Sequence, residues 1–398
     1  MNLLVLSDSF WPDRTGGITK SVLPEVETLV DRGHKTAVLT RRLRANLTLH
    51  ESRKGYDLFR YPSPPEGSFF YHLYPLYSLR QVPVHAARLY GEFKFNVAYV
   101  HNAYQAVGLS KCSEPIPYIY VMHAPTPGEI NIEIAHGKYG WKTPIAKAVN
   151  LWIKKVESQA LAHAKTIIVR SKFMKEQMQN FYGQDPMSKT IQIPLGIDTN
   201  QFSFVADQKD VRQKLNLPEE QPILLTVRRL AARMGLENLI TAMSEVVKHN
   251  PNVTLLLGGK GYLEEKLKQM IQNLNLGDQV RMLGFIPEEE LPMYYQAADL
   301  FILPTVELEG FGLSTIESLA CGTPVVATPV GANSEVIGPI NKKLLCENAS
   351  PKALAERIIW WVEQGIDSDL REHCHKYCSF HFNLEKVVNE IERVLAEN

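Results

Sequence analysis

Short apolar runs alternate with longer amphipathic segments along the whole chain. Residues 3–7 are an almost unbroken apolar run, as expected of a strand that a parallel sheet covers on both faces. A helical pattern over residues 18–32 ends at Gly33, and residues 35–40 predict the next strand. The chain therefore opens with a strand, a loop, a helix and a strand, and Gly16 and Gly17 lie where the helix begins.

The same alternation continues and later starts again. Further strands are predicted at 97–101, 118–122, 166–169 and 190–193, whereas residues 41–80 are predicted to be irregular, with basic and aromatic side chains. A polar segment at 200–220 precedes a second series of strands and helices that begins at residue 223. We therefore predict an α/β protein with Rossmann-like, doubly wound domains at 1–200 and 201–380, followed by an amphipathic helix within 381–398.

One helical pattern, residues 141–164, combines an apolar stripe with surrounding lysines. The stripe consists of Ile145, Val149, Trp152, Ile153 and Val156, and the lysines are Lys142, Lys147, Lys154 and Lys155. Such a helix either lies on a membrane surface or packs its stripe into the core and leaves the lysines in water. The core-packed arrangement is the expectation.

Composition describes a globular protein whose charge is unevenly distributed. The 398 residues suffice for two domains with full cores, and 45% of them are hydrophobic and 22% charged. Residues 1–200 contain 24 Lys and Arg against 16 Asp and Glu, and the remainder contains 19 against 27. An anionic partner, such as a membrane surface or an acidic acceptor, explains the excess, and so does an uneven solvated surface.

Location is also predicted from composition. The first apolar run is too short for a secretory leader, and no window holds the roughly 18 apolar residues of a membrane span. The five cysteines are scattered and suggest no disulfide framework, so we expect a cytoplasmic protein.

The stretch richest in chemistry is residues 300–336. It contains an apolar strand, a glycine-rich turn (307–312), a short helix (314–320) and another buried strand. Free N–H groups at the start of a helix bind anions such as phosphate, and the carboxylates of Glu309 and Glu317 can accept hydrogen bonds from hydroxyls. A ligand with both phosphates and hydroxyls is a nucleotide-sugar.

In order and spacing, several segments resemble the GT-B-fold retaining glycosyltransferases of family 4, or glycosyl transferases group 1. The resemblance spans nearly the whole chain and rests on Gly16, Gly17, His123, residues 193–198 with Phe202, 227–230, 258–261, 280–287, Glu309 with Glu317, and 322–326. It implies two Rossmann-like domains that face each other across a cleft, with the C-terminal helix returning to the N-terminal domain. The C-terminal domain would bind the nucleotide-sugar donor and the N-terminal domain the acceptor.

The resemblance also implies a role for each site residue. Catalytic roles would fall to Glu309, which binds hydroxyls of the transferred sugar, and to His123, Arg229 and Arg233. Glu317 would accept hydrogen bonds from the ribose, and Arg229 would contact the diphosphate. The other donor-binding residues would be Gly16, Gly17, Arg228, Gly259, Phe311, Gly312, Leu313 and Ser314.

One residue departs from the pattern of the family. A lysine is usual five positions after Arg229, but this chain has Met234, which cannot neutralise a leaving phosphate. Either Arg233 or Arg228 supplies the second cation, with Arg233 our choice, or the diphosphate is held with less positive charge.

The resemblance implies front-side transfer without a metal or other cofactor, in which the leaving diphosphate takes the acceptor proton. The donor would be a UDP- or GDP-sugar and the acceptor a hydroxyl of a sugar, glycolipid or polysaccharide, with no nucleic-acid partner. The protein would be cytoplasmic, or peripheral on the inner face of the membrane through its basic N-terminal domain. Asp367 and Asp369 precede a helical pattern and are interpreted as capping residues, and the cluster from His373 to His381 fits no standard zinc spacing.

Three other functions remain as alternatives. A nucleotide-sugar-binding partner of an active subunit would be consistent with Met234. An NDP-sugar epimerase on the same fold would need further acidic residues. An NAD-dependent dehydrogenase would need an acidic residue about 20 positions after the loop 258–261, and none ends a neighbouring strand there.

Overall fold

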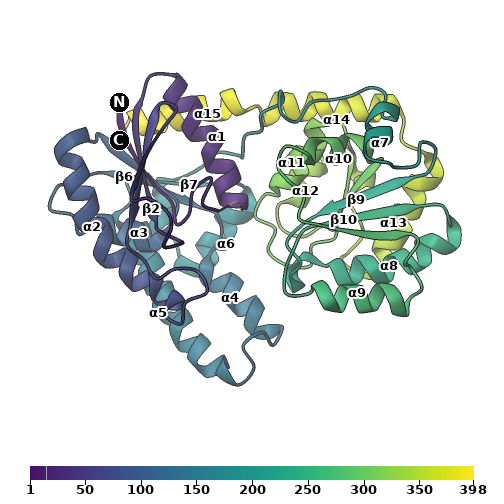
Figure 1. Ribbon diagram of the computed structural model, residues 1–398, viewed down its shortest axis with the longest axis horizontal. Coiled ribbons are helices and arrows are strands. Elements are labelled where there is room, and N and C mark those ends of the chain that lie inside the picture. The colour runs from purple at the N-terminus through teal and green to yellow at the C-terminus, as the bar shows by residue number, and fades with distance from the viewer. Residues whose placement is uncertain (15) are drawn as a thin grey trace. The chain divides into compact units, whose positions relative to one another are not determined.

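The computed structural model describes residues 1–14 and 16–398 (Figure 1). The chain forms two compact units, unit 1 with residues 1–196 and 384–398 and unit 2 with residues 197–383. Each unit is a parallel or mostly parallel sheet with helices on its faces, so the predicted α/β class with two Rossmann-like sheets is confirmed. The unit boundaries lie three or four residues from the predicted domain boundaries.

The sheet of unit 1 has eight strands, all parallel to their neighbours except at one edge. In spatial order they are β3 (His50–Arg53), β4 (Tyr56–Tyr61), β2 (Lys35–Arg41), β1 (Asn2–Leu6), β5 (Val97–Val100), β6 (Tyr118–Met122), β7 (Thr166–Val169) and β8 (Thr190–Gln192). Apolar side chains of α1 (Gly17–Asp31) and α15 (Leu384–Ala396) form a core with one face of this sheet. The other face is covered by α2 (Tyr74–Phe93), α3 (Ala103–Leu109), α5 (Thr143–His163) and α6 (Lys172–Tyr182).

Residues 41–80 were predicted to be irregular, and this prediction is wrong. They contain the antiparallel hairpin β3–β4 and the beginning of α2. The two-residue loop of the hairpin includes Gly55, which has a φ of +85°. The apolar pattern of β4 is interrupted by Arg60, whose side chain is buried and donates to the Asp13 carboxylate at 2.6 Å. The apolar pattern did not predict β4, because the arginine that interrupts it is buried by an ion pair with a residue outside the strand.

The sheet of unit 2 has five parallel strands. In spatial order they are β11 (Val280–Gly284), β10 (Thr254–Gly258), β9 (Ile223–Val227), β12 (Leu300–Leu303) and β13 (Val325–Ala327). The strand order reverses between β9 and β12, and ligands of such sheets bind beyond the carboxyl ends of the strands at this point.

The helices of unit 2 are α7 (Lys209–Lys214), α8 (Leu236–His249), α9 (Glu264–Asn273), α10 (Leu291–Ala297), α11 (Leu313–Ala320), α12 (Asn333–Ile337), α13 (Pro351–Gln364) and α14 (Ser368–His381). The Asp367 carboxylate accepts a hydrogen bond from the Leu370 N–H at 2.7 Å, so the predicted cap is confirmed. Unit 1 also contains the helix α4 (Thr126–Ala135). Short 3₁₀ turns are η1 (Tyr71–Leu73), η2 (Gly140–Lys142), η3 (Asp185–Lys189), η4 (Ala232–Met234) and η5 (Lys342–Leu344). Among the described residues, no helix combines the length and apolarity that crossing a bilayer requires.

The C-terminal helix α15 is part of unit 1, although the preceding residues belong to unit 2. Its Val388 and Ile391 side chains are fully buried against the sheet and α1. At its margin Arg32 donates to the carboxylate of Glu392 at 2.6 Å. The last residues of the chain therefore complete the core of the first unit.

Substitution of a buried side chain of α15 should destabilise unit 1. We expect Ile391→Ala to lower the free energy of unfolding by about 3 kcal/mol, because it removes buried methyl groups and leaves a cavity. The neighbouring exposed position gives the control, Glu390→Ala, which should change it by less than about 0.5 kcal/mol. Urea denaturation measures both, and equal midpoints for the two variants would contradict the docking of α15.

Candidate active site

The start of α11 is an uncapped helix N-terminus at the reversal point of the unit 2 sheet. Gly312 precedes the helix with a φ of +86°, a conformation that glycine adopts without strain, and none of the described side chains caps the helix. Within the described part of the chain, the N–H groups of Leu313 and Ser314 have no hydrogen-bond acceptor. These two predicted donor-binding residues therefore offer their amides to an anion.

Glu309 is buried three residues before Gly312, between the ends of β9 and β12. Its carboxylate forms an ion pair with Arg228, and its Oε2 accepts a hydrogen bond from the Thr305 hydroxyl at 2.8 Å. Burial alone would raise the pKa of Glu309, but Arg228 and the hydrogen bonds outweigh it, so the pKa lies below its ordinary value. Glu309 is therefore ionised at neutral pH.

The two carboxylate oxygens of Glu309 differ in their partners. Oε2 accepts hydrogen bonds from both Arg228 and Thr305, whereas Oε1 accepts none from residues 1–14 or 16–398. Oε1 is the atom that approaches Gly312, since a Cβ built on this glycine would lie 3.7 Å from it. One oxygen is thus held by the protein, and the other is available to a ligand hydroxyl beside the helix start.

Two of the three predicted arginines lie at Glu309. Besides Arg228, Arg233 donates to the Leu308 carbonyl at 3.0 Å, and its positive charge also lowers the pKa of Glu309. The side chain of Arg229 is exposed and has no hydrogen bond or ion pair with the part of the chain that the structure describes. The structure therefore brings Arg228 and Arg233 to the carboxylate and leaves Arg229 in solvent.

Met234, which stands where the family usually has a lysine, is a core residue. It is buried in the turn η4, directly before Gly235. Gly235 is required there because a Cβ would overlap the Pro304 carbonyl oxygen at 1.8 Å. The backbone between Arg233 and Gly235 therefore packs tightly on the strand end that leads to Glu309.

Glu317 and Phe311 are also buried. The Tyr295 hydroxyl donates to the Glu317 carboxylate at 2.7 Å, and Glu317 is only 4% exposed. The ring of Phe311 packs edge-on against Phe382 with centroids 5.4 Å apart and is buried within unit 2. Gly259, with a φ of +127°, packs so closely on the Arg228 carbonyl that a Cβ would lie 1.8 Å from that oxygen.

In unit 1 the predicted glycines lie at the start of α1. Gly16 is the N-cap residue and adopts an extended conformation with a φ of −174°, which any residue can adopt. A Cβ on Gly16 or Gly17 would meet no atom of residues 1–14 or 18–398 within 4 Å. Packing within the protein therefore does not require glycine at these exposed positions.

His123 follows β6 and pairs with a second histidine, His101, which follows β5. His123 Nε2 and His101 Nδ1 are 3.1 Å apart, and His101 is buried while His123 is half-buried. Burial and the positive charge of Arg170 lower the pKa of His123 to about 3 and that of His101 well below its ordinary value. Both rings are therefore neutral at physiological pH.

The surroundings of His101 select one tautomer of the pair. If His123 donated the shared proton, His101 would carry its own proton on Nε2, a buried atom that has no partner among the described residues. An unpaired buried N–H costs about 1–3 kcal/mol. We therefore infer that His101 donates and that His123 carries its proton on Nδ1.

The sequence missed the residues that support these two sites. In unit 2 they are Thr305 and the Arg228 contact to Glu309, and in unit 1 they are His101 and the buried ion pair of Arg170 with Glu25, 2.7 Å apart. Tyr99 donates to Glu25 at 2.9 Å and completes this pair. A usable signal existed for His101, because two predicted parallel strands each end at a histidine.

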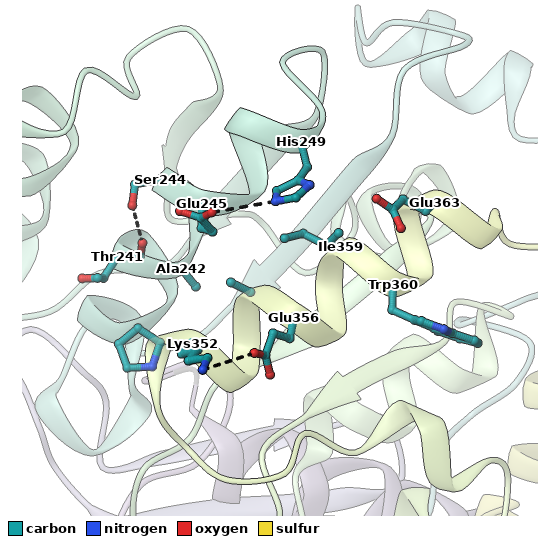
Figure 2. Close-up of a pocket in the computed structure, with 12 residues that line it drawn as sticks. Thr241, Ala242, Ser244, Glu245, His249, Lys352, Glu356, Ile359, Trp360 and Glu363 are labelled. Atoms are coloured by element: carbon teal, nitrogen blue, oxygen red, sulfur yellow. Dashed lines mark hydrogen bonds and ion pairs between the residues drawn. The ribbon is translucent and has the colours of Figure 1, made fainter.

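The region of α8 and α13 contains a separate hollow of about 670 Å³ (Figure 2). Ala242 and Ile359 line it, with Glu245, Glu356 and Glu363 among its polar residues. No predicted site residue borders this hollow. We therefore place the candidate site at Glu309 and the start of α11.

Loss of the Arg228 guanidinium should unbalance the buried charge on Glu309. We expect Arg228→Met to lower the free energy of unfolding by about 3–5 kcal/mol at pH 7, and Glu309→Gln in the same chain to restore a large part. The pKa of folded Glu309 lies below 4.5, so the ion pair contributes its full stabilisation of the fold above that pH. This stabilisation is lost as the pH falls through the lowered pKa. A double-mutant cycle by urea denaturation at pH 7 and at pH 3 measures this coupling; equal coupling at both pH values would contradict it.

Nitrogen NMR tests the state of the histidine pair. We expect His123 to stay neutral, with its proton on Nδ1, as the pH is lowered from 7 to about 5, because its pKa lies near 3. His101→Asn removes the ring that fixes the tautomer and should produce a mixture of Nδ1–H and Nε2–H forms of His123. Protonation of His123 between pH 7 and pH 5 would contradict the assignment.

Comparison with known proteins accounts for nearly the whole chain. Residues 15–201 match the family model described as Glycosyltransferase Family 4, and residues 207–379 match Glycosyl transferases group 1. An uncharacterised glycosyltransferase of Methanocaldococcus jannaschii is 25% identical over 94% of this chain and 91% of that protein. The GDP-mannose-dependent alpha-(1-6)-phosphatidylinositol monomannoside mannosyltransferase of Mycolicibacterium smegmatis is 26% identical over 84% of this chain and 82% of that protein.

Other relatives match over shorter stretches. The D-inositol 3-phosphate glycosyltransferase of Segniliparus rotundus is 28% identical, and the match spans 64% of this chain and 56% of that protein.

Solved structures show the same fold. Sucrose-phosphate synthase from Thermosynechococcus elongatus superimposes with a TM-score of 0.82 and 24% identity, over 100% of this chain and 98% of that one. HepE of Anabaena in complex with UDP-glucose gives a TM-score of 0.77 with 21% identity, over 100% of both chains. With both halves matched in order by these family models, the chain belongs to the GT-B-fold glycosyltransferases of family 4, glycosyl transferases group 1.

Proposed function

We propose that this enzyme transfers a hexose from a UDP- or GDP-sugar to a hydroxyl of a sugar, glycolipid or polysaccharide, with retention of configuration and without a metal. The observation that carries the proposal is the Glu309 carboxylate. It is ionised, Arg228 and Thr305 hold one of its oxygens, and the other is open beside the amides of α11. A sugar hydroxyl at Oε1 and a phosphate at the helix start fit the two ends of one ligand.

Relatives support the choice of donor. The mannosyltransferase of Mycolicibacterium smegmatis is GDP-mannose-dependent, and HepE binds UDP-glucose. Glu317 lies in α11, the helix that presents the amides, and accepts a hydrogen bond from Tyr295. It is the proposed acceptor of hydrogen bonds from the ribose. This role requires one of its buried oxygens to become accessible to the nucleotide.

The proposed reaction needs no protein nucleophile. The bond between the sugar C1 and the diphosphate oxygen breaks, and the acceptor oxygen forms a new bond to C1 on the same face. The acceptor proton passes to the leaving phosphate, whose growing negative charge is stabilised by the Leu313 and Ser314 amides and by nearby arginines. Arg233 and Arg228 supply positive charge in place of a lysine at position 234, and Arg229 is free to reach the diphosphate from solvent.

Within unit 1, His123 is proposed to contact the transferred sugar or the acceptor. As a neutral ring with its proton on Nδ1 it would donate a hydrogen bond to a sugar oxygen. Gly16 and Gly17, whose side-chain space is empty, would allow the diphosphate to approach the backbone. A cytoplasmic enzyme, peripheral at the inner face of the membrane, would reach acceptors that are carried by lipid.

No metal is part of the proposal. Among residues 1–14 and 16–398, no group of three or more His, Cys, Asp or Glu is arranged to hold a metal ion. Addition of EDTA is a simple arm of any activity assay and should leave the rate unchanged.

The second candidate is an inactive partner subunit that binds the nucleotide-sugar, which the loss of the lysine at Met234 favours. The arginines at Glu309 weigh against it, because in the proposed reaction they would supply the positive charge that Met234 lacks. An epimerase on the same fold and an NAD-dependent dehydrogenase are the remaining alternatives. Thermal shifts with UDP, GDP and NAD added separately distinguish the dehydrogenase, which alone would respond to NAD.

A donor screen tests the proposal directly. Purified enzyme is given UDP- and GDP-sugars with candidate acceptors, and nucleotide release is measured. We expect Glu309→Ala to abolish transfer, and Glu309→Gln, which keeps the size of the side chain, to lower kcat/KM roughly 100-fold through the lost charged hydrogen bond. Glu289→Gln changes the same residue type at an exposed position and should retain full activity.

Two results would overturn the assignment. Full activity in folded Glu309→Ala would remove Glu309 from the site. The absence of nucleotide release with every donor and acceptor, despite a thermal shift with UDP or GDP, would favour the inactive partner.

A further inference from the structure

Helices α4 and α5 form a hairpin in unit 1 (Figure 1). Asn150 of α5 donates to the Pro127 carbonyl of α4 at 3.1 Å and holds the two helices together. The large side chains near the turn and on the first half of α5 nevertheless remain exposed, with Trp141 at 82%, Ile145 at 60% and Leu151 at 73%. The hairpin thus presents three large apolar residues to its surroundings.

This exposure contradicts the expectation that the whole apolar stripe of residues 141–164 packs into the core. Only its second half does so, with Ile153 8% and Val156 5% exposed, whereas Val149 in the first half is 45% exposed. The physical reason is that α5 is longer than the part of it that contacts α3 and the sheet core. The first half of the helix needs another partner to cover its apolar side chains.

The turn of the hairpin and the part of α5 that follows it are basic. Residues 134–156 contain five lysines and no aspartate or glutamate, whereas α4 carries Glu129 and Glu133, of which Glu133 pairs with Lys138. Lys147, Lys154 and Lys155 are exposed, and within the described part of the chain they form no ion pair. Each lies three or four positions from Leu151, so they surround its side chain on the helix surface.

An anionic bilayer matches both properties at once. Exposed Trp, Ile and Leu gain free energy by entering the boundary between head groups and acyl chains, and lysines beside them attract anionic lipids. Tryptophan in particular favours the level of the head groups. A purely electrostatic partner would match the lysines but would leave Trp141, Ile145 and Leu151 in water.

A second exposed aromatic group is connected to this hairpin by packed rings. Trp152 of α5 stacks on Tyr104 with centroids 5.8 Å apart, and Tyr104 packs edge-on against Tyr74 at the start of α2. Just before that helix, Phe69 and Phe70 are 91% and 59% exposed. The packed rings therefore fix α5 to the segment that carries these phenylalanines.

We propose that the α4–α5 hairpin docks unit 1 on an anionic membrane, with Trp141, Ile145 and Leu151 in the interface and Lys147, Lys154 and Lys155 on the head groups. This proposal deepens the proposed function, on which its biological meaning rests, because a docked transferase meets acceptors carried by lipid. The docking surface itself is defined by unit 1 alone. Vesicle binding is therefore measured without donor or acceptor, so its failure is distinct from a failure of the transferase assay.

Sedimentation with vesicles of phosphatidylcholine and phosphatidylserine, at low and high salt, tests the charge. We expect the full chain to bind and the triple variant Lys147→Gln, Lys154→Gln, Lys155→Gln to bind on the order of 100-fold more weakly, since each lysine near the surface contributes about fivefold. The matched control Lys54→Gln, Lys111→Gln, Lys165→Gln removes the same charge from exposed positions elsewhere in unit 1 and should bind like the parent. Vesicles of phosphatidylcholine alone should bind weakly.

Quenching of tryptophan fluorescence by brominated lipids tests insertion. The chain has five tryptophans, and Trp141 is the exposed one on the docking surface. We expect brominated lipids to quench the fluorescence of the bound protein. The variant Trp141→Phe should still bind but lose most of that quenching.

Several outcomes would overturn the proposal. They are no binding to anionic vesicles at low salt, equal binding of the two triple variants, or quenching that persists in Trp141→Phe. A dimer in analytical ultracentrifugation that Leu151→Ser converts to a monomer would instead identify a second copy of the chain as the occupant of this surface.

Discussion

The structure of unit 2 depends on keeping one buried carboxylate, that of Glu309, ionised. A buried charge is tolerated only with a partner of opposite charge and hydrogen bonds to its remaining sites, and Arg228 and Thr305 supply both. Arg228 follows β9 and Thr305 follows β12, and although these two residues are 77 positions apart in the chain, the two strands are neighbours in the sheet. The reversal of strand order is therefore what creates the charge pair.

The backbone around Glu309 is arranged for the same purpose. Leu308 adopts a left-handed conformation with a φ of +54°, which costs a residue with a side chain roughly 1–2 kcal/mol. Gly331 packs so closely that a Cβ would lie 2.2 Å from the Glu309 carbonyl oxygen. Strain of this kind persists where surrounding contacts determine the conformation, and here they aim one carboxylate oxygen toward the start of α11.

Positive charge around Glu309 comes from Arg228 and Arg233 and not from position 234. Met234 is buried, so the position that usually carries a lysine contributes only packing. Arg228 and Arg233 both reach the Glu309 loop, and both charges contribute to its lowered pKa. In the proposed reaction the same arginines would lie near the sugar and the diphosphate. They would then both pair with Glu309 in the free enzyme and stabilise the charge that develops in the transition state.

Much of the fold was predictable because it follows from local patterns. The alternation of buried strands and amphipathic helices, the start of α11 and the Asp367 cap were all predicted from the sequence and are present. What failed depended on tertiary partners: β4 contains the buried Arg60, whose partner Asp13 lies outside the strand, and α5 is only half covered. The contact of Arg228 with Glu309 was equally hidden, because it requires knowledge of which strands are adjacent.

The two candidate groups at the strand ends use buried charge in opposite ways. In unit 2, arginines keep a carboxylate ionised and able to accept hydrogen bonds. In unit 1, burial keeps His101 and the half-buried His123 neutral, and the Arg170 cation, which is paired with Glu25, adds to this effect. A neutral His123 can donate a hydrogen bond without adding positive charge near a sugar that itself becomes cationic in the proposed transition state. Because Glu25 compensates Arg170 directly, the cation can lower the pKa of His123 while the network as a whole adds little net charge to the site.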